Sequence, residues 1–558
     1  MNRETESHFT YLPQVNIRRS SFKRPFTHKT SFNAGDLIPI YVDADILPGD
    51  TVKMEMGSLI RMQTPIFPVM DNAYMDLFWF FVPHRLVWDH FKEFWGENNL
   101  TAWEQQTEYT IPQIEAPSGG WNQGTIADYM GIPIGVDNIS INHLPFRAYC
   151  KIWNDFFRDE NLKDPCMITM DETTVTGTNS GDYVTYAEAG AKPLKAAKYH
   201  DQFTSALKAP QKGPSVNIPL GTTAPVYAGS DYYTLTSDQK HTMHFTGNNL
   251  SQGSHYQAVF AADSSTGAEL ERVSTTISSS DNSMYPDNLY ADLTNAIGAT
   301  INQLRQSFAI QAFYEAQARG GSRYIEMIQS IFGVTSPDAR LQRPEYLGGT
   351  RFSINMDQVL QTSSTDATSP QGNTAAFSCT VSSGEMFTHS FTEHGTLMCL
   401  GVIRTDHTYQ QGIEDQWLRK TKFDCYIPQF ANLGEMPIKN IQLYAQGSNV
   451  TDSDGNIVDD QIFGYQEAWY SYRFKPSMIS SELRSTYAQS LDYMHYGDEY
   501  SQLPTLSSGW IDETEANIDR TIAVQSSTSN QFFADFFFDG TYVRPMPIYS
   551  IPAMLNHF

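Results

Sequence analysis

Acidic side chains provide the first pattern in this 558-residue sequence that could bind a ligand. Asp452, Asp454 and Asn456 occupy positions 1, 3 and 5 of a calcium-loop pattern. An EF-hand loop needs glycine at position 6, and Ile457 stands there instead. The Asp-Gly pair that ends at Gly455 is typical of a tight turn. We therefore predict a turn rather than a metal site.

Catalytic motifs are absent from the sequence. No phosphate-binding loop, dinucleotide fingerprint, zinc-protease motif or nucleophile elbow occurs. Carboxylate pairs such as Asp43 with Asp45 mean little among 62 acidic residues, and lone histidines such as His84 and His389 are typical of hydrogen-bonded structural positions. Five well-separated cysteines indicate neither a zinc site nor a disulfide framework. We expect no catalytic residue, no metal and no cofactor.

Charge is distributed unevenly along the chain. The formal net charge is -25, yet residues 1–35 carry six basic and only two acidic side chains. We predict that 1–35 is a basic N-terminal arm that wraps a neighbouring subunit or its own barrel. An arm that contacts nucleic acid is the alternative, because phosphate binding depends on Lys and Arg. The candidate residues for that contact are Arg18, Arg19, Lys23 and Arg24.

A folded core must position the charged residues described above, and its central element is an aromatic-rich run at 75–83. Almost every side chain in it is apolar and Pro83 ends it, which predicts a strand covered on both faces. Apolar residues then recur at helical spacing over 86–95. Alternating patterns predict further strands at 37–42 and 51–62.

The rest of the chain combines strands, loops and some helix. Helical spacing predicts helices over 146–157, 287–319 and 324–332, with Gly320 and Gly321 ending the second. Apolar patterns predict strands over 385–392, 396–404, 462–474 and 532–538. Residues 171–285 are rich in Ser, Thr, Gly and Asn and predict a large surface insertion. It separates the first part of the fold, 36–170, from the remainder, 286–558. We predict a mainly β, antiparallel architecture with two buried layers and long insertions.

Five blocks of sequence resemble the major capsid proteins of microviruses, in particular the gokushovirus branch. The most specific is GGSRYIEMIQSIFGVTSPDARLQRPEYLGG at 320–349. The others are THKTSFNAGDLIPIYVDADILPGD at 27–50, MDNAYMDLFWFFVPHRLVWDHFKEFWGE at 70–97, FGYQEAWYSYRFKPS at 463–477 and LPTLSSGWI at 503–511.

The resemblance implies a viral jelly roll, an eight-stranded antiparallel sandwich with long loop insertions. It further implies pentamers and a T = 1 icosahedral shell of sixty copies around circular single-stranded DNA. The shell would be assembled in the cytoplasm of a bacterial host, and it would contain no membrane. The insertion at 171–285 would build threefold protrusions. Its exposure and its Ser, Thr and Tyr content lead us to expect that it contacts a host receptor. A small basic DNA-binding protein and a minor pilot protein would be partners. Arg340 and Arg343 join the DNA-facing candidates, although arginines beside prolines and glycines also commonly fix loops at subunit interfaces.

Two other functions fit parts of the pattern. A β-sandwich that binds or hydrolyses carbohydrate would use the aromatic loops as sugar platforms. A phage spike would form a stable trimer without shells. The polar stretch 1–9 has no apolar signal region, which leads us to expect synthesis in a cytoplasm.

Overall fold

The computed structural model describes the greater part of the chain, in two compact units. The first unit comprises Met1–Pro210 with Ala316–Phe558, and the second comprises Gln211–Glu315. The described residues are 18–97, 107–214, 216, 226–228, 245–247, 259–263, 267–271, 284–286, 289–291, 301–363 and 370–549.

Two four-stranded antiparallel sheets form the centre of the first unit. The open sheet has the order β1-β21-β3-β17, and the covered sheet has the order β14-β4-β18-β2. The strands are β1 (Ser20–Phe32), β2 (Ile38–Ile46), β3 (Thr51–Met62), β4 (Ala73–Pro83), β14 (Glu345–Ser353), β17 (Thr380–Ser390), β18 (Gly395–Thr405) and β21 (Phe532–Arg544). The second half of the predicted basic arm is thus an edge strand, β1.

The main core lies between the two sheets. In β3, Val52, Met54 and Met56 point inward and alternate with polar residues that point outward, as a half-buried strand requires. Trp79 of β4 and Phe538 of β21 meet across this core with ring centroids 5.8 Å apart. The strand predictions at 37–42, 51–62, 396–404 and 532–538 are confirmed, and the strand predicted at 385–392 begins earlier, at Thr380.

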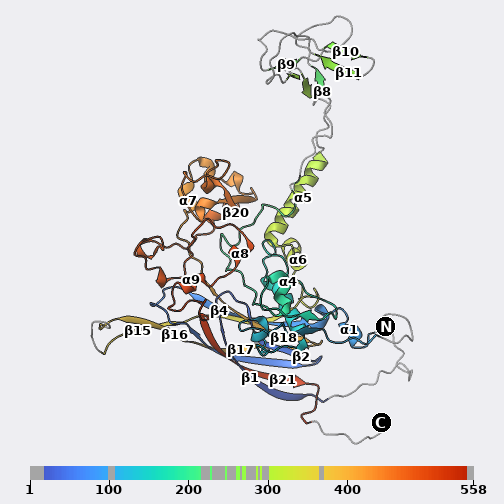
Figure 1. Ribbon diagram of the computed structural model, residues 1–558, viewed down its shortest axis with the longest axis vertical. Helices are drawn as coiled ribbons and strands as arrows, with labels where there is room; N and C mark the ends of the chain where they lie inside the picture. Colours follow the sequence, from blue (N-terminus) through green and yellow to red (C-terminus); the bar gives the residue numbers. More distant parts are fainter. Residues whose placement is uncertain are drawn as a thin grey trace. The chain divides into compact units, whose positions relative to one another are not determined.

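The covered sheet is buried on its second face as well. Phe80 and Val82 of β4 and Leu400 of β18 pack there with buried residues of the helix α3, Leu144–Ile152. Figure 1 shows the covered sheet between β1 and β21 on one side and the segment around α4 on the other. The prediction of a strand covered on both faces at 75–83 is therefore confirmed.

The remaining strands and helices lie outside the two central sheets. The strands outside the sandwich in this unit are β5 (Gln113–Glu115), β6 (Ser140–Asn142), β7 (Val175–Thr176), β15 (Met356–Leu360), β16 (Thr374–Ser378), β19 (Glu435–Lys439) and β20 (Ile462–Glu467). The other helices are α1 (Phe91–Phe94), α2 (Ile126–Tyr129), α4 (Tyr183–Tyr186), α5 (Ile301–Gly320), α6 (Tyr324–Phe332), α7 (Asp415–Leu418), α8 (Ser508–Ile511) and α9 (Ala516–Asp519). The helix prediction at 324–332 is confirmed, and α3 continues as a π-helix, Trp153–Phe157, which confirms the helical run at 146–157.

Three predicted elements differ from the structure. The helix expected over 86–95 is only the single turn α1, because the chain bends to bury Trp88, whose indole N–H donates to Glu172 at 2.6 Å. The strand expected over 462–474 ends at Glu467, since Trp469 adopts a left-handed conformation with φ of 65°. Within the helix expected over 287–319, Leu289–Ala291 pairs instead as strand β13 with β8, the stretch 292–300 lies outside the described residues, and the helix α5 is described from Ile301.

The second unit contains short paired strands. They are β8 (Val226–Ala228), β9 (Phe245–Gly247), β10 (Val259–Asp263), β11 (Gly267–Glu271), β12 (Met284–Pro286) and β13 (Leu289–Ala291). The predicted insertion, 171–285, overlaps this unit but begins earlier. Residues such as Leu194 and Phe203 are buried in clusters of the first unit, so the chain leaves that unit only after Pro210.

Candidate functional site

Three of the predicted DNA-facing residues lie at the start of the open sheet. Arg18 and Arg19 are exposed and directly precede β1, and the guanidinium of Arg19 lies against the turn at Gly49. Lys23 points to the outer face of β1, and its amine lies 3.9 Å from a carboxylate oxygen of Asp539. This arrangement provides three solvent-accessible positive charges at one edge.

Arg24 has a different environment. It points toward the neighbouring sheet, where its guanidinium lies 2.6 Å from Asp43, whose carboxylate is almost completely buried. The same carboxylate accepts a hydrogen bond from the hydroxyl of Tyr542 at 3.0 Å, and the Arg24 guanidinium stands over the Tyr542 ring at 4.7 Å. Arg24 therefore links the open sheet to the covered sheet instead of presenting a free charge.

Arg340 and Arg343 lie elsewhere. Arg343 pairs with Asp338 at 3.2 Å, and its guanidinium stands 3.9 Å above the ring of Phe156, which packs on the outer side of the covered sheet. Arg340 is exposed in the same loop. The structure does not bring these two arginines together with Arg18, Arg19 and Lys23.

The outer face of the open sheet contains functional candidates that sequence reasoning missed. Phe533 and Phe537 of β21 are 40% and 49% exposed, whereas Phe532, Phe536 and Phe538 are buried. The sequence predicts a strand over 532–538, and the alternation along it places these two rings on the face opposite the core. Beside these rings lie exposed ion pairs, Lys29 with Asp535 at 3.1 Å and Lys53 with Glu55 at 2.9 Å. The face is therefore both aromatic and charged.

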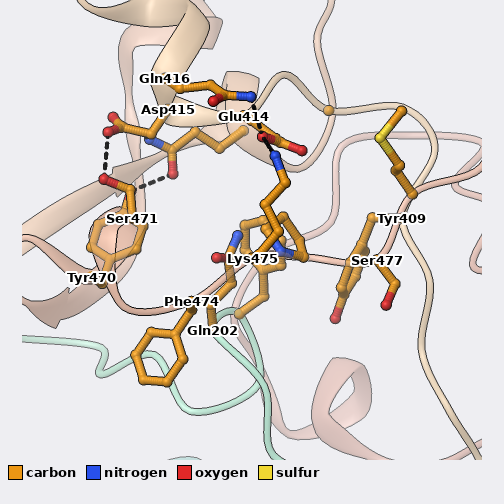
Figure 2. A pocket seen from close by; sticks show the side chains of 15 residues that line it. Gln202, Tyr409, Glu414, Asp415, Gln416, Tyr470, Ser471, Phe474, Lys475 and Ser477 are labelled. Atoms are coloured by element: carbon orange, nitrogen blue, oxygen red, sulfur yellow. Dashed lines mark hydrogen bonds and ion pairs between the residues drawn. The ribbon is translucent and has the colours of Figure 1, made fainter.

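A small pocket of about 80 Å³ lies at α7 and beside the chain that follows β20. Figure 2 shows Ser471 turned toward Asp415, with 2.7 Å between their oxygens, and Lys475 turned toward Glu414, at 2.5 Å. Asp415 also binds Arg419 at 3.0 Å. Both acids are therefore engaged in internal contacts.

A buried cluster of ionisable groups surrounds His407. The ring of His407 lies between the carboxylates of Asp498, at 3.1 Å, and Glu513, at 2.9 Å. Burial disfavours a charge on this ring, but the two carboxylates outweigh burial and raise the pKa of His407 to about 10. Despite its own burial, the pKa of Asp498 is lowered by His407 and by Lys198. The cluster holds the chain after β18 in place.

The Asp-rich loop is the predicted turn. Oδ1 of Asp452 accepts the backbone N–H groups of Asp454 and Asn456, each at 2.9 Å, and Gly455 has φ of 83°. Within the described ranges, no group of three or more His, Cys, Asp or Glu is arranged to hold a metal ion. Among the same residues, no helix has the length and apolar character needed to cross a membrane.

Comparison with known proteins gives a consistent family. Residues 10–554 match the family described as capsid protein (F protein). The chain is 42% identical to the capsid protein VP1 of Spiroplasma virus 4, over 98% of this chain and 97% of that protein. It is 41% identical to the capsid protein VP1 of Bdellovibrio phage phiMH2K, over 100% and 99% of the two chains. For the capsid protein VP1 of Chlamydia phage 1 the identity is 37%, over 98% of each.

These matches cover nearly the whole chain and confirm the resemblance to microvirus capsid proteins. They favour a structural component of the virion over a carbohydrate-active enzyme. This chain belongs to the phage capsid protein (F protein) family and is a structural, non-enzymatic major capsid protein.

Proposed function

We propose that the sandwich is a viral jelly roll and forms the wall of a T = 1 shell of sixty copies. The observation that carries the proposal is the strand pairing. Along the chain, the first sandwich strand pairs with the last, the second with the seventh, the third with the sixth and the fourth with the fifth. This is the pattern of one long antiparallel ribbon rolled into two sheets, which is how a jelly roll is built.

The two sheets suggest which side of the wall faces inward. Residues within 87–91 and 109–196 cover the outer face of the covered sheet, and the exposed charges Arg18, Arg19 and Lys23 lie at the open sheet. The proposed orientation therefore turns the open sheet to the interior, toward single-stranded DNA, and the covered side to the exterior. Contacts between different surfaces of neighbouring copies would close into pentamers, and the pentamers would then associate into the shell.

A net charge of -25 on each copy means that the shell cannot neutralise the genome alone. The proposal therefore includes a small basic DNA-binding protein inside the particle, and a minor pilot protein as a further virion component. Of the predicted insertion 171–285, the part that belongs to the second unit, 211–285, is proposed to contact a receptor on the bacterial host. Exchanging this segment between two phages and measuring attachment to each host would test that contact.

The DNA contact is tested by replacing Arg18, Arg19 and Lys23 with alanine. Arg24 is left unchanged because its pair with Asp43 is internal. We expect particles with less packaged DNA. We also expect particle stability to depend less on salt, because fewer phosphates are bound and fewer counterions are released. Arg340→Ala is the matched control, since Arg340 is exposed in the same loop as Arg343, which packs on Phe156 at the outer side of the covered sheet. Unchanged DNA content and salt response in the triple variant would contradict the contact.

Native mass spectrometry of purified particles tests the shell itself. We expect a protein mass that corresponds to sixty copies of the 63.0 kDa chain plus its partners. A stable trimer, or a monomer that persists with every virion component supplied, would refute the shell and favour a spike or a soluble binding protein.

A further inference from the structure

Residues 417–426, WLRKTKFDCY, form an exposed segment that combines large aromatic rings with positive charge; we call it the basic-aromatic segment. Trp417 is 76% exposed, Phe423 60% and Tyr426 45%. The segment carries three basic side chains and one acidic side chain in a chain with a net charge of -25. Exposed tryptophan with adjacent cations is the composition of an interface centre rather than of ordinary solvent-facing surface.

The backbone of the segment is held in one conformation. The carboxylate of Asp424 accepts the backbone N–H groups of Lys420 and Thr421 at 2.9 and 2.6 Å. Tyr426 packs on Trp469, with 5.6 Å between ring centroids, and its N–H donates to the hydroxyl of Tyr472 at 3.2 Å. A surface that is already ordered loses little conformational entropy when a partner binds.

The cations of the segment are available for a partner. Arg419 is used internally, because it pairs with Asp415 and stands 4.2 Å above the ring of Tyr472. Lys420 and Lys422 form no ion pair with any carboxylate in the part of the chain that the structure describes. Lys422 instead stands 5.0 Å above the ring of Phe423. The aromatic rings are thus flanked by two positive charges that are not held in close ion pairs, although Lys439 and, less strongly, the nearby Lys420 lower the pKa of the Asp460 carboxyl.

We propose that the basic-aromatic segment docks on an acidic surface of a second copy of this chain within the shell. The inference rests on the proposed shell and names one of its contacts. Two observations favour a copy over nucleic acid. A neighbour with a net charge of -25 is complementary to Lys420 and Lys422, and local cations offset the repulsion between acidic copies. In Figure 1, α7 and β20 also lie across the covered sheet from β1 and β21, away from the proposed DNA side.

Cys425 lies inside the segment and reports on its burial. Its thiol is exposed, whereas Cys150, Cys166 and Cys399 are buried and Cys379 is half-buried. Dissociated subunits and intact particles would be treated with a maleimide, and labelling of each cysteine would be followed by mass spectrometry. We expect at least tenfold slower labelling of Cys425 in particles than in subunits. Cys399 is the internal control, because its protection in both samples shows that the subunit remains folded.

Equal labelling of Cys425 in subunits and in closed particles would overturn the docking proposal and leave the shell intact. Failure of the wild-type chain to form particles would instead refute the shell, and the docking proposal with it. Protection that disappears in DNA-free particles would assign the segment to nucleic acid and also overturn the proposal.

Substitutions provide an independent readout. Lys420→Glu with Lys422→Glu should reduce the particle yield at least tenfold, while the subunit keeps its circular dichroism spectrum and thermal midpoint. Val381→Ala is the matched control, because Val381 is 70% exposed on the open sheet, and it should assemble normally. Normal assembly of the double variant would contradict the charge complementarity on which the proposal depends.

Discussion

The covered sheet and the open sheet each have four antiparallel strands, but their outer faces are chemically different. Phe80, Val82 and Leu400 on the covered sheet are completely enclosed, whereas Phe533 and Phe537 on the open sheet remain about half exposed. The first sheet is stabilised from both sides and serves as the structural centre. The second is buried on one face only, and its other face remains available to a partner.

The same difference is found among the charges. On the covered sheet, Asp76 is buried and binds the guanidinium groups of Arg351 and Arg404. On the open sheet, Lys29 and Asp535 form an exposed pair at 3.1 Å. Removing one partner of a buried pair leaves an uncompensated charge away from water, whereas exposed pairs contribute little. Ion pairs built from similar residue types thus contribute different amounts to the free energy of unfolding in the two sheets.

The largest expected effect comes from the aromatic core. Trp79→Ala in β4 removes a ring that packs on Tyr41, Phe387 and Phe538, with centroids 5.2 to 5.8 Å apart. We expect a loss of about 3–5 kcal/mol in the free energy of unfolding. Phe537→Ala on the open face should lose less than about 1 kcal/mol. Urea unfolding of the two purified variants checks this, and equal losses would remove the distinction between the sheets.

The buried ion cluster is expected to have the next largest effect. Asp76→Asn weakens contacts with Arg351, Arg404 and the hydroxyl of Tyr199, which donates to Asp76 at 2.8 Å. We expect a loss of about 3 kcal/mol, because two guanidinium groups lose their shared carboxylate. The matched control on the open sheet is Asp539→Asn, for which we expect a change within about 0.5 kcal/mol. A comparable loss in both variants would contradict the energetic comparison.

Alkaline pH should weaken the attachment of the chain that follows the covered sheet. The pKa of His407 is about 10 when folded, against about 6.5 when unfolded. Because the pKa of His407 is raised in the folded state, its protonation adds to the free energy of unfolding. This contribution is fully present below about pH 6.5 and is lost as the pH rises toward 10. Between pH 7 and 10 this amounts to about 3 kcal/mol. His407→Gln is the reference, and thermal unfolding of both proteins measures the difference. Parallel pH profiles would show that Asp498 and Glu513 do not hold an imidazolium.

The smallest effect is expected for the open sheet's own ion pairs. A double-mutant cycle on Lys29 and Asp535 should give a coupling of about 0.2–1 kcal/mol that decreases with added salt. The cycle is measured by urea unfolding at low and high ionic strength. A salt-independent coupling above 2 kcal/mol would mean that this face is not open to water in the folded chain.

The sequence predicts three of the four covered-sheet strands, β2, β4 and β18, but not β14, and the best-predicted strand has a physical reason. A run such as 75–83, apolar on both faces, has no stable place except between two layers, and this interpretation is confirmed. β1 was assigned instead to a basic arm, because its lysines and arginines resemble a solvated tail. Its pairing with β21 joins residues 500 or more positions apart, and no local pattern carries that information.

The candidate sites were less predictable, because their roles depend on partners distant in sequence. Arg24 and Arg343 have no evident partner in the sequence. In the fold, Arg24 forms an ion pair with Asp43, and Arg343 stacks over the ring of Phe156. The sequence places Trp417 in no predicted element, and only the structure shows that it is uncovered. Burial of one particular charge or ring is decided by tertiary packing rather than by its neighbours in the chain.

Electron cryomicroscopy of intact, DNA-filled particles tests the central claim most directly, because it shows which sheet faces the genome. We predict sixty copies of the chain, with the open sheet and Lys23 facing the interior and the covered side facing outward. A shell in which the open sheet faces the exterior would contradict the proposed link between the asymmetry of the two sheets and the two sides of the capsid wall.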